Sequence, residues 1–329
     1  MKKALVIGLN DYPNSPLNWC VNDANEVADL ISLNGDGSEN FNTFKIAGDC
    51  DNDKLYSSIE KLFSDDDDIA LLYFSGHGFE EDGGRICGTN TDGSSIGIRM
   101  DDIIKLANES RCKNRIVILD CCYAAKLGGY SMMPDGNSHL SQGLTIMAAC
   151  QTWQTAQEED NIQHGVFTNL LIEGLKGGAA DINGNITPAS LYSFVDQSLG
   201  AWQQRPVFKT NTSRFIPVRK VPAKVSTKVL RNLTVYFKRP DDEFKLNPSF
   251  EFTNCPTVNH KILQPYASKE NVTKFKELQL LESVGLVKPT GTNHMYFAAM
   301  ESKSCKLTKL GQHYWKLSKK EQEIKTGEI

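Results

Sequence analysis

The sequence predicts an α/β fold, with a mainly parallel sheet flanked by helices, followed by a small α+β domain. Over roughly the first two hundred residues, short apolar runs rich in β-branched residues alternate with amphipathic stretches. This alternation is typical of a parallel sheet with crossover helices on both faces. The pattern changes after Arg219–Lys228, where proline, valine and lysine are interleaved. We therefore expect domains at residues 1–217 and 229–329, joined by a linker at residues 218–228.

The expected strands are the apolar runs of the first domain. They are Lys3–Leu9, Asn42–Ile46, Asp68–Ser75, Arg115–Asp120, Leu144–Ala149 and Pro206–Thr210. The expected helices are Asn22–Leu33, Asp53–Phe63, Met100–Ala107, Val166–Leu175 and Pro188–Leu199. In the first helix, Val27, Leu30 and Ile31 recur at helical spacing. The stretch Ala124–Gly143 has no clear period and is rich in Gly, Ser, Met and Pro, which predicts a mobile loop.

The C-terminal part has a different pattern. Asn271–Ser283 is an amphipathic helix that ends at Gly285, and Thr308 is suited to cap a last helix. Between them, Leu286–Val287 and His294–Ala299 are predicted as two short strands. This order of elements resembles a winged-helix module.

Composition excludes several classes of protein. The chain has 329 residues with 40% hydrophobic and 23% charged residues, as in an ordinary globular protein. Its nine cysteines include no CxxC pair, so neither a disulfide framework nor a zinc ribbon is indicated. The N-terminal apolar run ends at Asn10, too early for a signal peptide or a membrane span. We therefore expect a cytoplasmic protein that does not bind membranes.

The charge is distributed unevenly along the chain. Residues 1–219 hold 17 Lys and Arg against 29 Asp and Glu, and residues 220–329 hold 19 against 11. The first part is therefore at −12 and the second at +8, within a total of −4. We expect basic partners for the first part and acidic partners for the second.

Two groups of residues at strand ends can carry chemistry. Gly76-His77-Gly78 directly follows one predicted strand, and Cys121-Cys122 directly follows another. Ligands of parallel sheets bind beyond the carboxyl ends of the strands. A thiol nucleophile needs a base that removes its proton, and glycines beside the histidine let a substrate backbone approach. Each feature alone is more often structural, but together they indicate a Cys-His dyad.

The same segments resemble a known family. Tyr73–Gly78, with the sequence YFSGHG, is similar to the histidine motif of the caspase-like cysteine peptidases, which include caspases, metacaspases and bacterial relatives. Asp120–Ala124, with the sequence DCCYA, resembles the Asp-Ser-Cys-His-Ser motif of that family. Leu144–Ala149 and His164–Thr168 are similar to segments of the bacterial members. The resemblance covers about residues 1–215 and implies a caspase-like fold.

The resemblance also implies catalytic roles. Cys122 is the nucleophile, because the family's cysteine stands two residues after the aspartate, and His77 is the general base. Cys121 takes the position of the family's serine and stays the alternative nucleophile. The backbone N–H groups of Gly78 and Cys122 form the oxyanion hole. The resemblance requires no acid that orients His77, and the implied reaction is peptide-bond hydrolysis through a thioester.

The resemblance to metacaspases implies a pocket for the P1 side chain, the residue just before the cleaved bond. Its residues correspond to Cys20, Asp23, Ser75 and Asp120. Buried carboxylates favour a cationic partner, and arginine is preferred because it binds in a bidentate manner. The implied substrate is a protein or peptide with Arg or Lys at P1. The alternative for Asp23 is an ordinary acid in the first turn of a helix.

No metal site is predicted. Some metacaspases need calcium, and Asp101-Asp102 correspond to part of their site. The position of a further carboxylate of that site falls near Gly129, so this ligand is absent. A calcium requirement therefore stays open. The remaining histidines, His164 among them, are expected to be core or surface residues.

The sequence thus predicts a cysteine endopeptidase with a C-terminal regulatory domain that binds a protein partner. By analogy with bacterial relatives, its role would lie in stress response, cell death or anti-phage defence. Two alternatives remain. One is a catalytically idle scaffold with the same fold, and the other is a regulator that binds nucleic acid through its positively charged C-terminal domain.

Overall fold

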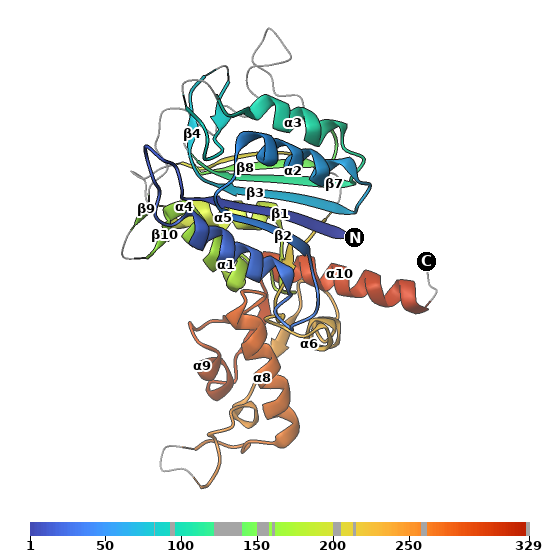
Figure 1. The fold of residues 1–329 in the computed structure, drawn as a ribbon. Coiled ribbons are helices and arrows are strands. Elements are labelled where there is room, and N and C mark those ends of the chain that lie inside the picture. Colours follow the sequence, from blue (N-terminus) through green and yellow to red (C-terminus); the bar gives the residue numbers. More distant parts are fainter. Residues whose placement is uncertain are drawn as a thin grey trace. The chain divides into compact units, whose positions relative to one another are not determined.

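The computed structural model describes residues 1–81, 83–92, 96–121, 140–149, 158–159, 162–199, 205–212, 215–257 and 262–326, without the side chains of residues 158–159 and 325–326. The chain forms two compact units, Met1–Pro222 and Ala223–Ile329 (Figure 1). Each unit is described separately. Cys122 and most of the predicted loop Ala124–Gly143 lie outside the described residues.

A six-stranded sheet forms the centre of the first unit, in the order β12-β8-β7-β3-β1-β2. Its strands are β1 (Lys2–Leu9), β2 (Asn42–Gly48), β3 (Ile69–Ser75), β7 (Asn114–Asp120), β8 (Leu144–Ala148) and β12 (Val207–Asn211). The first five are parallel, and β12 is antiparallel to β8. The prediction of a mainly parallel sheet is confirmed. All seven residues of β3 and of β7 are buried, which explains their continuous apolar runs.

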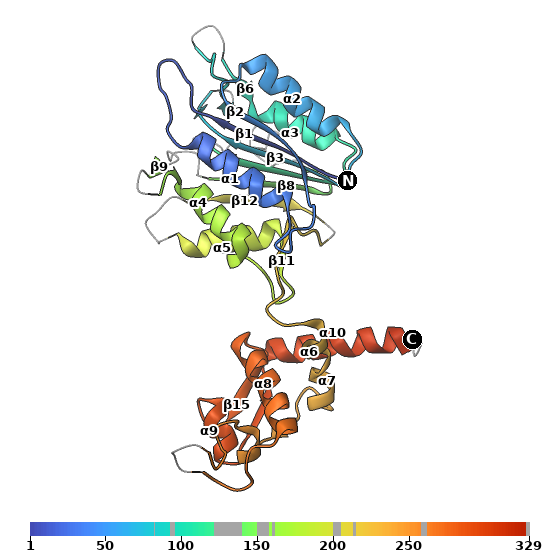
Figure 2. The same cartoon turned by 60° about the horizontal axis from the view of Figure 1, so that its bottom comes forward.

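Helices cover both faces of this sheet (Figure 2). On one face lie α2 (Asn52–Ser64) and α3 (Met100–Glu109). On the other lie α1 (Cys20–Ser32), α4 (Val166–Glu173), the π-helical turn η2 (Gly174–Gly178) and α5 (Pro188–Ser198). Because side chains alternate along a strand, Leu72 and Phe74 of β3 pack on the α2–α3 face, and Leu71 and Tyr73 pack on the α1–α4 face. Each face therefore has its own hydrophobic core.

One glycine sets how closely α1 packs on the sheet. A Cβ at Gly8, in β1, would lie 2.1 Å from the carbonyl oxygen of Cys20 and 2.7 Å from the Cβ of Ala24. No larger residue fits there without moving the helix. The first turn of α1, which includes Asp23, is thereby held against the end of β1.

Several short strands were not predicted. They are β4 (Gly78–Phe79), β5 (Arg85–Ile86) and β6 (Ile98–Arg99) in one sheet, β9 (Glu158–Glu159) with β10 (His164–Gly165), and β11 (Asn185–Ile186) with β13 (Arg219–Lys220). Each has two residues, too few to show a hydrophobic period. Because β13 pairs with β11, the first unit includes Arg219 and Lys220 of the expected linker 218–228.

The second unit contains an antiparallel sheet in the order β14-β16-β15. In chain order its elements are α6 (Thr227–Arg231), α7 (Leu233–Tyr236), β14 (Glu243–Lys245), the 3-10 turn η3 (Pro248–Phe250), α8 (Lys269–Ser283), β15 (Val287–Thr290), α9 (Met295–Met300), β16 (Ser304–Leu307) and α10 (Lys309–Thr326). Gly285 follows α8 with a φ of 73°, as a C-terminal glycine does. Thr308 accepts a hydrogen bond from the N–H of Gly311 at 3.0 Å and so caps α10.

One prediction in this unit is wrong. His294–Ala299 was expected as a strand, but Met295–Met300 form the helix α9. His294 caps it, since its Nδ1 accepts the N–H of Tyr296 at 3.1 Å. Met295, Ala298 and Ala299 are fully buried, at the i, i+3, i+4 spacing of a helix rather than the alternation of a strand. The strand that pairs with β15 is β16, and the winged-helix assignment stays a prediction.

Within the part of the chain that the structure describes, no helix has both the length and the apolar character needed to cross a membrane.

Candidate active site

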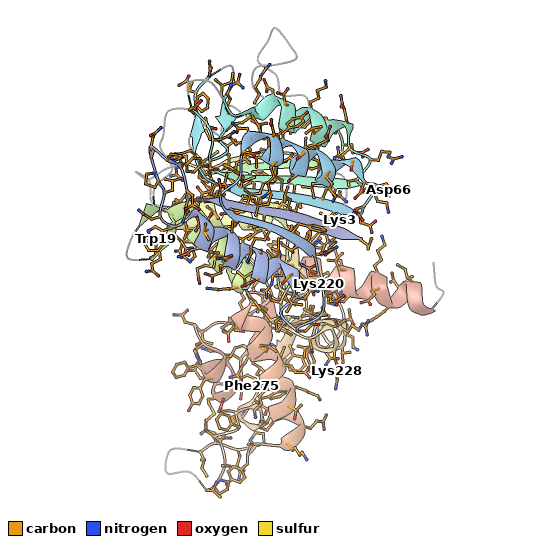
Figure 3. All side chains as sticks on the ribbon, viewed as in Figure 1. Lys3, Trp19, Asp66, Lys220, Lys228 and Phe275 are labelled. Atoms are coloured by element: carbon orange, nitrogen blue, oxygen red, sulfur yellow. The ribbon has the colours of Figure 1, made fainter. Side chains whose placement is uncertain are left out.

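The carboxyl ends of two adjacent strands carry the predicted motifs. Strands β3 and β7 are parallel neighbours, and their last residues, Ser75 and Asp120, are register partners. The N–H of Gly76 also donates to the carbonyl oxygen of Asp120 at 3.3 Å. In Figure 3, Lys3 and Asp66 lie where β1 and β3 begin, and Trp19 lies at the opposite edge, where the strands end. His77 thus follows β3 at the edge where ligands of parallel sheets bind.

The imidazole of His77 is held by the loop that follows β1. Its Nε2 lies 2.6 Å from the carbonyl oxygen of Ser15. The ring of Tyr12 packs edge-on against it, with 4.5 Å between the ring centroids. The backbone is fixed as well. Tyr12 Oη accepts the N–H of His77 at 3.0 Å, and Cys87 donates its N–H to the carbonyl oxygen of His77 at 3.0 Å.

These contacts determine how the imidazole can act. A carbonyl oxygen only accepts hydrogen bonds, so Nε2 of His77 carries the proton and donates to Ser15. In neutral His77, Nδ1 then keeps its lone pair and can accept a proton. A backbone carbonyl therefore orients His77. Burial raises the pKa of Tyr12, so its hydroxyl stays neutral and donates to the carbonyl oxygen of Cys87 at 2.9 Å.

Asp23, in the first turn of α1, is buried rather than solvent-exposed. Its residue is 1% exposed. Ser75 Oγ donates to Asp23 Oδ2 at 3.0 Å, and Gly165 donates its backbone N–H to both carboxylate oxygens at 3.3 and 3.4 Å. His164 Nδ1 lies 2.8 Å from Oδ1. The position is therefore unlike that of an ordinary first-turn acid, which stays in water.

Asp120, at the end of β7, ends a buried chain of hydroxyl groups. Thr168 Oγ1 donates to Asp120 Oδ2 at 2.7 Å and lies 2.6 Å from Tyr73 Oη. Because threonine has one hydroxyl proton, which it gives to the carboxylate, Tyr73 must donate to Thr168. Burial raises the pKa of Tyr73, and the negative charges of Asp23 and Asp120 add to this effect.

Gly165 lies between the two carboxylates. A Cβ there would lie 2.7 Å from Asp120 Oδ2 and 3.3 Å from Asp23 Oδ2. Two buried acidic groups thus converge on one glycine at the carboxyl ends of β3 and β7. A cationic ligand would stabilise such a pair of charges.

His164 completes this cluster, and its ring has partners there, as expected of a satisfied core or surface histidine. Its Nδ1 contacts Asp23, and its Nε2 lies 3.1 Å from Glu26 Oε2. Lys176 Nζ lies 2.9 Å from the other oxygen of Glu26. His164 belongs to the segment His164–Thr168, which resembles bacterial members of the family. In the sequence, the feature that could have indicated a site here is that His164 and Gly165 stand directly before a helix.

The predicted pocket residues are mostly brought together. Asp23 and Asp120 converge on Gly165, and Ser75 is hydrogen-bonded to Asp23. Cys20 is the buried first residue of α1, three positions before Asp23. Gly78 begins β4, where it pairs with Ile86.

Of the two adjacent cysteines, Cys121 lies in the part of the chain that the structure describes and Cys122 does not. Cys121 is 1% exposed and packs in the core on the α2–α3 face. Cys122, the predicted nucleophile, lies outside the described residues.

Two of the residues suggested for calcium, Asp101 and Asp102, lie in the part of the chain that the structure describes. Asp101 and Asp102 lie in the first turn of α3, and Arg99 Nη2 lies 3.4 Å from Asp101 Oδ2. Gly129 is outside the described residues. Among the residues whose positions are known, no three His, Cys, Asp or Glu side chains are grouped to hold a metal ion.

Thr168 provides a test of the hydroxyl chain. Thr168→Val keeps the shape of the side chain but removes the donor to Asp120 and the acceptor for Tyr73. We expect the free energy of unfolding to fall by about 1–3 kcal/mol in urea denaturation. Thr168→Ser keeps the hydroxyl and should lose only about 1 kcal/mol through the missing methyl group. A valine variant as stable as the wild type would show that the chain of hydroxyls does not stabilise the fold.

The fold of this chain is similar to that of a solved caspase structure. Caspase-1 from Spodoptera frugiperda has 13% sequence identity and a TM-score of 0.50, covering 67% of this chain and 90% of its own. A protein from Geobacter sulfurreducens has 18% identity and a TM-score of 0.48, covering 68% of this chain and 98% of its own. A search of curated proteins finds no match.

The family is shown by the sequence. The profile of the caspase domain, peptidase family C14, matches residues 1–216, which are nearly all of the first unit. The chain therefore belongs to the caspase-domain family of cysteine peptidases.

Proposed function

We propose that this protein is a cysteine endopeptidase that hydrolyses peptide bonds after Arg or Lys, with Cys122 as nucleophile and His77 as general base. The observation that carries the proposal is the convergence of two buried carboxylates, Asp23 and Asp120, on Gly165 at the strand ends. His77 follows one of these strands by two residues, and Cys122 follows the other by two residues.

The choice of Cys122 over Cys121 has two supports. The family's cysteine stands two residues after an aspartate, which here is Asp120. Cys121 is buried in the core on the α2–α3 face, whereas Asp23 and Asp120 lie on the α1–α4 side together with Thr168. A thiol in the core is inert toward a peptide substrate.

The reaction follows from the tautomer of His77. Nδ1 takes the thiol proton of Cys122, and the thiolate attacks the carbonyl carbon of the scissile bond. The peptide C–N bond breaks, and the imidazolium returns the proton to the departing amine. Water, deprotonated by the same imidazole, then hydrolyses the thioester and regenerates the thiol. The N–H groups of Gly78 and Cys122 would stabilise the oxyanion.

The preference for a basic P1 residue follows from charge. A guanidinium group donates two parallel hydrogen bonds to a carboxylate, and its attraction to Asp23 and Asp120 is strong where water is excluded. An acidic P1 side chain would instead add a third negative charge to the same pocket. The net charge of −12 on residues 1–219 agrees with a basic substrate.

The second unit is proposed to bind a regulatory protein partner. Its excess of positive charge does not form an uninterrupted basic surface, because several basic side chains are paired with acids. These pairs are Arg231–Glu321, Arg239–Asp242, Lys274–Glu270, Lys303–Glu301 and Lys319–Glu323. Phosphate binding along a nucleic acid needs basic groups that are free to replace counterions. A role in stress response, cell death or anti-phage defence is proposed by analogy with bacterial relatives only.

The dyad is tested with an Arg-terminated fluorogenic peptide. Cys122→Ala and His77→Ala should each lower kcat by about 1,000-fold or more, because either change removes an essential part of the nucleophile. Cys121→Ser should retain turnover. Retained activity in Cys122→Ala would contradict the assignment. A wild-type protein that cleaves neither basic nor acidic reporters, even with its partner present, would favour the idle scaffold.

The P1 pocket is tested with a peptide library that varies P1. Asp120→Asn should lower kcat/KM for Arg reporters by about 100-fold, because a buried charge pair loses one member. Asp66→Asn, at an exposed aspartate on the opposite edge of the sheet, is the matched control and should behave as wild type. A wild-type preference for an acidic P1 residue would refute the pocket.

The alternative of nucleic-acid binding is tested with a random labelled DNA duplex and the full chain. At about 50 mM salt we expect no saturable change in fluorescence anisotropy. The alternative would be supported if the duplex binds and the logarithm of the binding constant falls steeply and linearly with the logarithm of the salt concentration.

A further inference from the structure

A groove runs along the outer edge of the six-stranded sheet, between β2 and α2. It encloses about 330 Å³. The beginning of β1, Phe44, Lys45 and Ile46 of β2, and one side of α2 line it. None of its lining residues belongs to the proposed catalytic dyad or to the proposed P1 pocket. The groove is therefore a separate feature of the first unit.

The floor of this groove is apolar. Leu5 and Leu62 belong to the hydrophobic core on the α2–α3 face, and Ile46 packs against that core. Phe44 is two positions before Ile46 on the same strand, so its side chain points to the same face. Phe44 is nevertheless 53% exposed. A single exposed apolar residue is ordinary, but one that borders an apolar groove enlarges a surface on which a partner can dock.

The rim of the groove carries an excess of positive charge. Its lining holds four lysines and one aspartate, although the first part of the chain carries −12. The aspartate, Asp65, pairs with Lys3. Among the described residues, no acid is in ion-pair contact with Lys45, Lys54 or Lys61. Lys54 and Lys61 are seven residues apart in α2 and so lie on one side of the helix. The groove is thus a basic surface on an acidic unit.

Strand β2 is also an open edge of the sheet. It is last in the strand order and pairs with β1 alone among the described strands. Sheets commonly protect such an edge with a bulge, a proline or a very short strand. In contrast, β2 has seven residues without proline, and its pairing with β1 is regular from Asn42 to Gly48. Its outward N–H and C=O groups can therefore pair with a further strand.

We propose that this groove docks an extended, acidic segment of a protein partner, which adds a strand to β2. The backbone of the segment would pair with the open edge of β2. Its apolar side chains would pack on Phe44 and the floor of the groove. Its Asp and Glu side chains would pair with Lys45, Lys54 and Lys61, which gives the groove its preference for an acidic partner.

The length of the groove agrees with such an occupant. Helix α2 borders it from Lys54 to Asp65, which is about 16 Å at about 1.5 Å per residue. An extended chain covers this length with about five residues. The same groove on a second copy of this chain is a poor occupant, because two surfaces of equal positive charge repel each other.

Binding is tested with the full chain and a fluorescein-labelled peptide of the sequence Asp-Val-Glu-Ile-Asp-Val-Glu. The peptide has no Arg or Lys, so the proposed peptidase activity leaves it intact. We expect saturable binding in fluorescence anisotropy that weakens as salt increases. A peptide with Asn and Gln in place of Asp and Glu should bind about tenfold more weakly or less. Absence of saturable binding by the acidic peptide would refute the proposal.

Lys54→Glu reverses one charge of the rim. Lys54 is the third residue of α2, where Glu suits the helix N-terminus, so the midpoint of urea denaturation should not fall. We expect this variant to bind the acidic peptide about tenfold more weakly. Lys105→Glu is the matched control, at an exposed lysine of α3 that does not line the groove, and should bind as wild type does. Equal binding by Lys54→Glu and wild type would overturn the inference.

The addition of a strand is tested by amide hydrogen exchange with mass spectrometry. The bound peptide should slow exchange in β2 and leave β12, at the other edge of the sheet, unchanged. If exchange in β2 is unaffected, strand addition is wrong. Two further results would contradict the acidic-peptide proposal. One is binding to phosphatidylserine vesicles, but not to the peptide, that Lys54→Glu abolishes. The other is a dimer in sedimentation velocity that Lys54→Glu dissociates.

Discussion

The parallel register of β3 and β7 is the constraint on which the site depends. It pairs Ser75 with Asp120, so the two strands end side by side. The residues that follow each strand therefore begin at the same edge of the sheet. Side-chain alternation then directs Tyr73, Ser75 and Asp120 toward the α1–α4 face, away from the core under α2 and α3. A slip of the register by one residue would move these polar groups to the other face.

Burial of two carboxylates at this edge requires donors from several elements. Asp23 reaches the strand ends because Gly8 lets α1 approach β1, and it is hydrogen-bonded from β3 and β10. Asp120 is hydrogen-bonded by Thr168 of α4. The site therefore ties α1, the sheet and the beginning of α4 together. Loss of any one donor leaves a buried carboxylate with fewer hydrogen bonds, so these contacts link the stability of the fold to the arrangement of Asp23 and Asp120.

The sequence predicts those parts of the structure that are local. Strands β1, β3, β7 and β8 follow from buried apolar runs, and Asp23 and Asp120 follow from the resemblance. The orienting group of His77 does not, because it is the backbone carbonyl of Ser15, and every residue has such a group. The contact of His164 with Asp23 could not be predicted, because the two residues are 141 positions apart in the sequence. Helix α9 was taken for a strand because Met, Tyr and Phe suit both structures, and only the buried spacing decides between them.

The central claim is that the sulfur of Cys122 is activated by His77 beside a pocket for a cationic side chain. The most direct measurement is covalent labelling with an arginyl chloromethyl ketone, followed by peptide mapping by mass spectrometry. We expect one adduct, on Cys122, that forms much more slowly in His77→Ala and with an aspartyl chloromethyl ketone. An adduct on Cys121, or equal labelling by the arginyl and aspartyl reagents, would contradict the account.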